Sequence, residues 1–248
     1  MARTATAETL ASHVYEEIRS DILNGRFEPG QRLKPGELRL RFNVSVSVVR
    51  EALARLAEQR LVRAEHNQGF QVAPLSESDL RDLTAIRVQV EGYALRTSIE
   101  RGDFEWEAHV VAAHHILTVT PARDSERPKR SSEAWSRAHR EFHRALIQGC
   151  DMPILLDICD SLFDASELYR RMSAPFTKGR RDVACEHREI MEATLARDAD
   201  LAVARLSQHF ETTTALLMTG LLGKQPGSSG KAVATKLTVS PRRRKTAS

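Results

Sequence analysis

Four histidines occupy positions that apolar side chains normally take. His139 and His143 lie four residues apart in one predicted helix, whose apolar positions are Trp135, Ala138, Phe142 and Leu146. His187 and His209 fall in the same way within the apolar repeats of two later predicted helices. Residues at i and i+4 share one helix face, so all four imidazoles are predicted to point into a helical core.

These buried imidazoles have two chemical interpretations. A single buried neutral histidine is typically a core residue whose two ring nitrogens are hydrogen-bonded. Four imidazoles on converging helices are more economically explained as ligands of one divalent metal ion in a helix bundle. The predicted ligands are His139, His143, His187 and His209. A site made of four imidazoles favours Zn²⁺ or Ni²⁺ over Mn²⁺ or Mg²⁺.

The elements that carry these histidines belong to a segment predicted to be almost entirely helical. Apolar residues recur there with a helical period, and Gly and Pro mark the breaks. About six helices are expected, at 79–101, 103–119, 132–149, 153–173, 179–197 and 199–222. Pro74 and Ser76–Ser78 mark a linker before them. Residues 75–223 are therefore predicted to form an all-helical bundle domain.

The preceding segment has a different pattern. A helical repeat over 9–24, with Thr9 as its expected N-cap, is followed by a short helix over 36–42. Ser45 is a good N-cap for a third helix. Two short extended runs, 61–64 and 70–72, indicate a hairpin. Three helices and a hairpin in about 65 residues are the arrangement of a winged helix-turn-helix.

Residues 1–74 are accordingly predicted to be a DNA-binding domain, and the fold class mainly α. In this arrangement the third helix enters the major groove and the hairpin contacts an adjoining groove or phosphate. The expected contacts from the third helix are Ser45, Val46, Ser47 and Arg50. Lys34, Arg39 and Arg41 on the preceding helix are expected to hold phosphates. His66 and Gly69 are expected to contact DNA from the hairpin.

Charge is distributed unevenly along the 248 residues, whose formal net charge is +4. Residues 1–74 carry +2, residues 75–223 carry −5, and residues 224–248 carry +7. The last segment is rich in Gly and Ser without an apolar period, so it is predicted to be a disordered basic tail. It is expected to act either as a solubilising extension or as an electrostatic DNA anchor.

Other features of the sequence favour a cytoplasmic protein. Its three cysteines, Cys150, Cys159 and Cys185, have no C-x-x-C spacing and indicate no disulfide framework. No apolar run approaches the roughly 20 residues that span a bilayer, so no membrane partner is expected. Residues 1–8 lack the apolar region of a secretory signal.

Several motifs resemble a known family. The segment Val44–Leu53 (VSVSVVREAL) and the wing sequence Asn67–Phe70 (NQGF) resemble the GntR family of bacterial transcription regulators. The helical part resembles its FCD branch, named for the FadR C-terminal domain. The residues that carry this second resemblance are the pattern D-L-x-D-L-x-x-I-R-x-x-x-E over 79–91 and the triplet Glu141–His143. Together the motifs cover about residues 9–222.

The resemblance implies a homodimer that binds a pseudo-palindromic operator and holds an effector cavity, often with a divalent metal, in its helical domain. The family's metal pattern, Asp-x-x-x-His and then one His on each of two later helices, falls on the four histidines. His139 stands at the aspartate position, either as a fourth imidazole ligand or pointing away with water in its place. Arg87 falls on the family's cavity arginine, which would bind a small carboxylate effector; alternatively, it only pairs with Glu91 on the same helix.

The third helix also departs from the family. Val46 stands where the family commonly has arginine, and Val48 where it has proline. A valine offers only apolar contact, such as with a thymine methyl group. A different operator sequence is therefore expected.

The function expected is that of a ligand-responsive transcriptional regulator, a repressor rather than an enzyme. One alternative is a metal-dependent hydrolase that uses the histidine site. The segment His139–His143 (HREFH) does not match the zinc-protease motif H-E-x-x-H, because its glutamate is third rather than second. Another alternative is a nucleoid-type DNA binder that depends on the basic tail.

Overall fold

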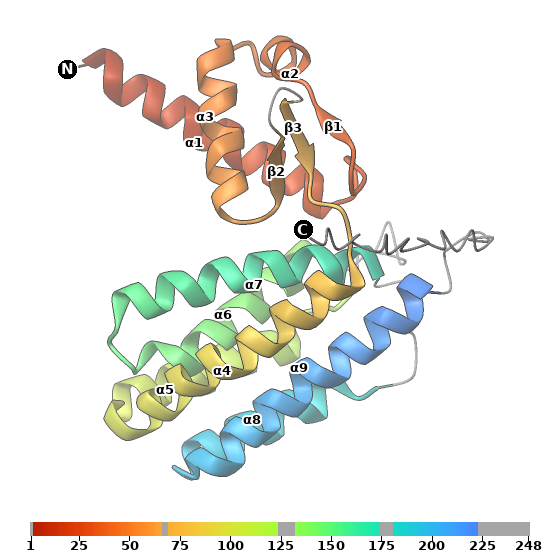
Figure 1. Cartoon of the computed structure of the whole chain (residues 1–248). Helices are drawn as coiled ribbons and strands as arrows, with labels where there is room; N and C mark the ends of the chain where they lie inside the picture. The colour runs from red at the N-terminus through yellow and green to blue at the C-terminus, as the bar shows by residue number, and fades with distance from the viewer. Residues whose placement is uncertain (1, 66–68, 124–131, 174–180, 223–248) are drawn as a thin grey trace, which may run out of the picture.

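The computed structural model describes residues 2–65, 69–123, 132–173 and 181–222. An N-terminal domain of helices and a small sheet lies above a larger helical domain (Figure 1). The predicted fold class, a winged helix-turn-helix followed by a helical bundle, is confirmed. Predicted features at His66 and in 224–248 lie outside the described residues.

The N-terminal domain is built on three helices and three short strands. They are α1 (Ala2–Leu23), β1 (Arg32–Leu33), α2 (Pro35–Phe42), α3 (Val46–Glu58), β2 (Val62–Glu65) and β3 (Gly69–Val72). The antiparallel sheet has the order β1-β3-β2. Ser45 caps α3 as predicted, since its hydroxyl accepts a hydrogen bond from the amide of Val48 at 3.4 Å. The core includes Ile18, Leu53 and Leu56, all fully buried.

One predicted feature of this domain was wrong, and one strand was not predicted. The first helix begins at Ala2 rather than after Thr9. The sequence before Thr9 contains three alanines, the best helix formers, so the helix continues backwards through it. Strand β1 was not predicted, because two residues show no alternation and its pairing with Gln71 and Phe70 of β3 is a tertiary contact.

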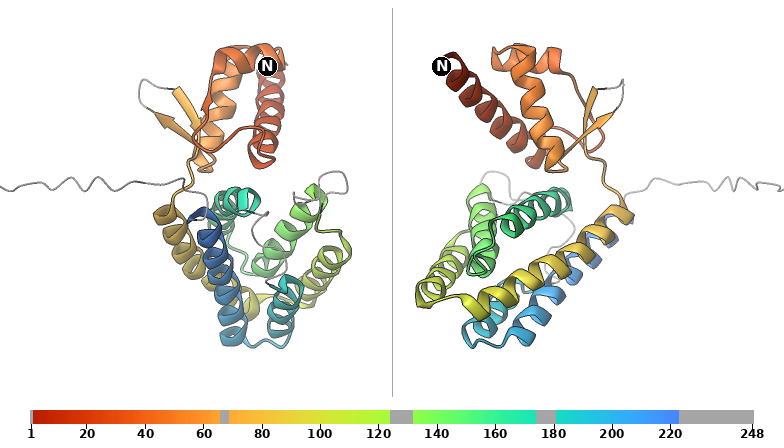
Figure 2. Two further views of the ribbon diagram at one scale, coloured as in Figure 1. Left: turned by 90° about the vertical axis from the view of Figure 1, so that its right-hand side faces the viewer. Right: turned by 60° about the vertical axis from the view of Figure 1, so that its left-hand side comes forward.

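The helical domain contains six helices among the described residues, as predicted. They are α4 (Glu77–Arg101), α5 (Phe104–Val119), α6 (Glu133–Gln148), α7 (Pro153–Ser173), α8 (Val183–Leu195) and α9 (Ala199–Leu222). The expected linker is shorter than predicted, because Ser76 is the N-cap of α4 and accepts from the amide of Asp79. Helices α4 and α9 run side by side (Figures 1 and 2). The core between the helices includes Phe142, Leu146 and Ile190.

Helix α7 joins the two domains, lying beneath α1 (Figure 1). Leu168 of α7 is buried within the core of the N-terminal domain. Arg19 of α1 forms an ion pair of 2.6 Å with Asp164 of α7. The amide of Ser76, in the connection between domains, donates to the Tyr169 hydroxyl of α7 at 3.4 Å. The same helix therefore supports the DNA-binding domain and forms part of the bundle.

Two further expectations concern cysteines and membranes. All three cysteines are free thiols, and two of them, Cys150 and Cys159, are buried. Among the described residues, no helix is both long and apolar enough to cross a bilayer.

Candidate metal and effector site

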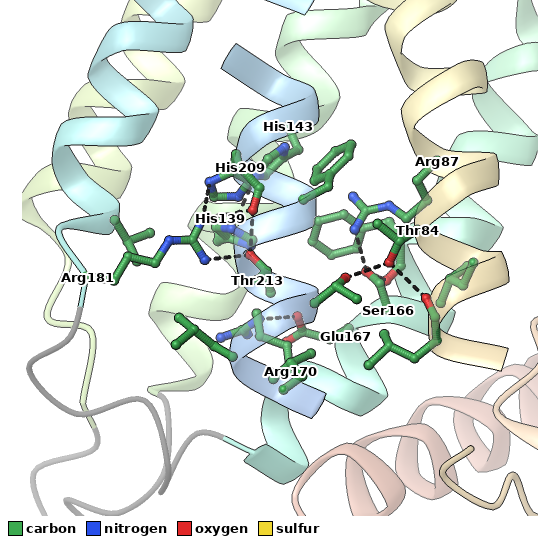
Figure 3. Close-up of a pocket in the computed structure, with 18 of the residues that line it drawn as sticks. Thr84, Arg87, His139, His143, Ser166, Glu167, Arg170, Arg181, His209 and Thr213 are labelled. Atoms are coloured by element: carbon green, nitrogen blue, oxygen red, sulfur yellow. Dashed lines mark hydrogen bonds and ion pairs between the residues drawn. The ribbon is translucent and has the colours of Figure 1, made fainter. Parts of the chain in front are cut away.

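The four predicted ligands meet in the core of the bundle. His139 and His143 come from α6, His187 from α8 and His209 from α9. All four side chains are buried, and one nitrogen from each lies within 4.8 Å of the other three. His139 faces this cluster rather than pointing away from it (Figure 3). The helical period of the sequence was sufficient to predict this convergence.

One pair of these nitrogens has the spacing of ligands on a tetrahedral ion. His139 Nε2 and His143 Nε2 lie 3.2 Å apart. Tetrahedral Zn²⁺ with bonds of about 2.0–2.1 Å sets its ligand atoms roughly 3.3 Å apart. Three buried nitrogens have no hydrogen-bond partner among the described residues: His139 Nδ1, His143 Nδ1 and His187 Nε2. An ion held by the Nε2 atoms of His139 and His143 leaves both Nδ1 atoms as they are, so His187 Nε2 is the atom of these three that an ion could satisfy.

The electrostatic environment keeps the imidazoles neutral. Burial lowers the pKa of His139, His143 and His187 well below the usual value, and the neighbouring histidines lower it further. Burial also lowers the pKa of His209, although Glu186 opposes the shift. A neutral imidazole has a free electron pair on one nitrogen, so the cluster is in the protonation state that metal binding requires.

A cavity of about 320 Å³ opens beside the cluster (Figure 3). His139, His143 and His209 form part of its wall. Hydroxyl groups and aromatic rings supply much of the remainder: Thr84, Ser166, Thr213, Thr214, Trp135, Phe163 and Phe210. Its size and mixed lining suit a small organic molecule with polar groups.

Arg87 lines this cavity. It also pairs with Glu91, the alternative role expected from the sequence. Its guanidinium lies 2.5 Å and 3.2 Å from the two carboxylate oxygens of Glu91, and both residues are buried. It donates to Ser166 of α7 at 2.9 Å and lies over the ring of Phe210 at 3.9 Å. The pair with Glu91 and a position on the cavity wall are thus compatible.

Sequence reasoning missed three other arginines in the cavity wall, Arg123, Arg170 and Arg181. Arg170 of α7 binds the buried Glu167 with contacts of 2.5 and 2.7 Å. Arg181, which precedes α8, lies on the opposite side of the cavity from Arg87 (Figure 3). It forms an ion pair with Glu186. Arginine is common on protein surfaces, so the sequence alone gave no signal that these residues line a cavity.

The expected DNA-contacting residues lie on the N-terminal domain. Ser45, Ser47, Arg50, Gly69 and Arg39 are exposed, and Val46 is half-buried. Gly69 has a φ of +85°, a conformation that favours glycine.

Two of the predicted phosphate contacts already bind carboxylates. Lys34 pairs with Glu37 at 2.7 Å. Arg41 pairs at 2.5 Å with Asp21, whose side chain is buried. Arg41 therefore holds helix α2 against α1. Its contact with phosphate stays a prediction.

Comparison with known proteins agrees with this architecture. The family model of bacterial regulatory proteins of the gntR family matches residues 10–72. The FCD domain model matches residues 82–212, which is more than half of the chain. The chain belongs to the GntR family. It is a transcriptional regulator with a DNA-binding domain and an FCD domain.

Similar GntR regulators come from several bacteria. The transcriptional regulator BphR of Paraburkholderia xenovorans is 36% identical over 213 residues, covering 86% of this chain and 87% of BphR. The transcriptional repressor GlaR of Escherichia coli is 32% identical over 213 residues, covering 84% of this chain and 96% of GlaR. These names describe regulators rather than enzymes.

Solved structures show the same fold. A GntR regulator from Rhodococcus sp. RHA1 superimposes with a TM-score of 0.67 at 24% identity, covering 84% of this chain and 97% of that one. McbR/YncC of E. coli superimposes with a TM-score of 0.66 at 20% identity, covering 86% and 98%.

Proposed function

We propose that this GntR regulator is a cytoplasmic, homodimeric repressor controlled by a divalent metal and a small carboxylate effector in its helical domain. The observation that carries the proposal is the cluster of four buried, neutral imidazoles on the wall of a cavity that also holds Arg87. It is supported by His187 Nε2, a buried nitrogen without a hydrogen-bond partner among the described residues.

Each part of the cavity has a role in this proposal. His139, His143, His187 and His209 hold the ion, with Zn²⁺ or Ni²⁺ favoured by a set of nitrogen ligands. The bound ion supplies positive charge and a Lewis-acid centre for a carboxylate oxygen. Arg87 donates to the second oxygen, because hydrogen bonds from a guanidinium to a carboxylate are charge-assisted and strong. Phe163 and Phe210 contact the carbon skeleton.

Helix α7 is the element through which the effector acts on the DNA-binding domain. Phe163, Ser166 and Arg170 face the cavity. Two residues on the other side of the same helix contact the N-terminal domain. Asp164 pairs with Arg19 of α1, and Leu168 packs in the N-terminal core. An effector that binds better to one placement of α7 shifts the population of DNA-domain placements in the dimer and weakens operator binding.

Metal content tests the first part of the proposal. The protein is purified without a polyhistidine tag and analysed by elemental mass spectrometry beside the variant His143→Ala/His187→Ala. About one divalent ion per chain, absent from the variant, is expected. Absence of metal, together with unchanged melting after Zn²⁺ or Ni²⁺ is added, would refute the metal site.

DNA binding tests the second part separately. Gel shifts with fragments from around its own gene are expected to give a specific complex that survives moderate salt. Truncation after residue 223 is expected to leave that specificity intact. Loss of all specific binding on truncation would instead support a nonspecific binder that depends on the basic tail.

A further inference from the structure

His209 differs from His139 and His143 in having a partner for its outer nitrogen. His209 Nδ1 lies 2.9 Å from Glu186 Oε2. By contrast, His139 Nδ1 and His143 Nδ1 are buried without a hydrogen-bond partner among the described residues. Glu186 belongs to α8, one residue before His187, and its side chain is 27% exposed. It therefore lies just outside the cluster, against one of the four imidazoles.

Two charged groups compete for this nitrogen. Arg181 Nη2 lies 3.0 Å from His209 Nδ1. A guanidinium only donates hydrogen bonds and an ionised carboxylate only accepts them. Nδ1 therefore pairs with Glu186 when it carries the proton, and with Arg181 when it does not. The first arrangement leaves the electron pair of Nε2 free, whereas the second places the proton on Nε2 and prevents metal binding there.

The surroundings of Glu186 favour the first arrangement. Glu186 Oε2 lies closer to His209 Nδ1, at 2.9 Å, than Arg181 Nη2 does, at 3.0 Å. The ion pair with Arg181 also gives the Glu186 carboxylate a positive counter-charge.

Other contacts of Arg181 hold it beside Glu186. Its guanidinium donates to the Thr213 hydroxyl at 2.6 Å and to the His209 carbonyl at 2.8 Å, and it also binds Glu186. These bonds give Arg181 acceptors other than Nδ1.

We propose that Glu186 is the positioning residue of the metal site: it orients His209, fixes its Nδ1–H tautomer and adds negative charge next to a ligand set that has none. This inference rests on the proposed metal site. Carboxylate partners of metal-bound imidazoles commonly have this role. The added charge matters more here, because His139 replaces a carboxylate ligand with a neutral imidazole.

The test compares Glu186→Gln with a matched control, Glu189→Gln. Glu189 lies on the same helix and also pairs with an arginine, Arg205, at 3.5 Å. Among the described residues, no hydrogen bond or ion pair joins it to a clustered histidine. Zn²⁺ affinity of the metal-free, full-length proteins is measured by competition with a chromophoric chelator. Glu186→Gln is expected to bind Zn²⁺ about ten- to a hundredfold more weakly. The control is expected to stay within about twofold of the wild type.

A second measurement does not require metal. Nitrogen-15 NMR of the metal-free wild type reports which nitrogen of His209 carries the proton, and Nδ1–H is expected. An Nε2–H tautomer would overturn the inference even if Glu186→Gln fails to fold. Equal Zn²⁺ binding by the wild type and a folded Glu186→Gln would overturn it while leaving the metal site standing. Absence of Zn²⁺ binding by the wild type would refute the metal site itself.

Discussion

Glu167 is a buried carboxylate in the part of helix α7 that lies between the cavity and the DNA-binding domain. It accepts hydrogen bonds from Arg170, on the cavity wall, and from Arg171 at 2.6 Å. Arg171 also donates to Asn24 at the end of α1 and to Glu133 of α6. We predict that Glu167→Gln destabilises the folded protein in a pH-dependent way.

The magnitude follows from the pKa of this carboxyl group. Burial raises it, but the charges of Arg170 and Arg171 and their hydrogen bonds lower it from 4.5 to about 2. At about 1.4 kcal/mol per pH unit, the ionised carboxylate contributes about 3 kcal/mol to the free energy of unfolding. A carboxyl group with a depressed pKa gives its full contribution above the unfolded value. That contribution is lost as the pH falls through 4.5 towards 2.

Urea unfolding at pH 7 and at roughly pH 3.5 measures this contribution. Glu167→Gln is expected to be less stable than the wild type by about 3 kcal/mol at neutral pH, and by about 2 kcal/mol in acid. The matched control is Glu133→Gln, which removes a half-exposed partner of the same Arg171 and is expected to cost less than about 1 kcal/mol. The reasoning would be refuted if the two substitutions had equal effects. It would also be refuted if the stability difference between Glu167→Gln and the wild type did not become smaller in acid.

Three other substitutions test the packing and the DNA-binding surface. Leu168→Ala, which removes the α7 side chain from the N-terminal core, is expected to cost about 2–5 kcal/mol in denaturant unfolding. Gly102→Ala places a methyl group 2.2 Å from the Trp106 ring and 2.7 Å from the Ser98 carbonyl. It is expected to lower the melting temperature by an amount equivalent to about 1–3 kcal/mol. Arg50→Ala is expected to weaken operator binding by about 1–3 kcal/mol in anisotropy titrations, with unchanged melting.

The sequence was most informative where polar residues occupied positions at which the helical repeat calls for apolar ones. Histidines at apolar positions of three helices predicted a converging cluster, because the helix fixes which side chains share a face. Ser45 predicted the start of α3 because an N-cap bond is local to one turn. Strand β1 and the inward-facing Arg181 were missed, since both depend on contacts with residues distant in the sequence.

Under the proposed function, the arginine pairs on the cavity wall set what a carboxylate effector must do to bind. Three arginines on the cavity wall have a carboxylate partner: Arg87 pairs with Glu91, Arg170 with Glu167 and Arg181 with Glu186. An effector carboxylate must share Arg87 with Glu91 or displace it, and a displaced buried carboxylate is costly. Arg87 also holds Ser166 of α7. Under the proposed function, a change in the partners of Arg87 therefore alters a contact of the helix that carries the DNA-binding domain, and effector binding and operator affinity become linked.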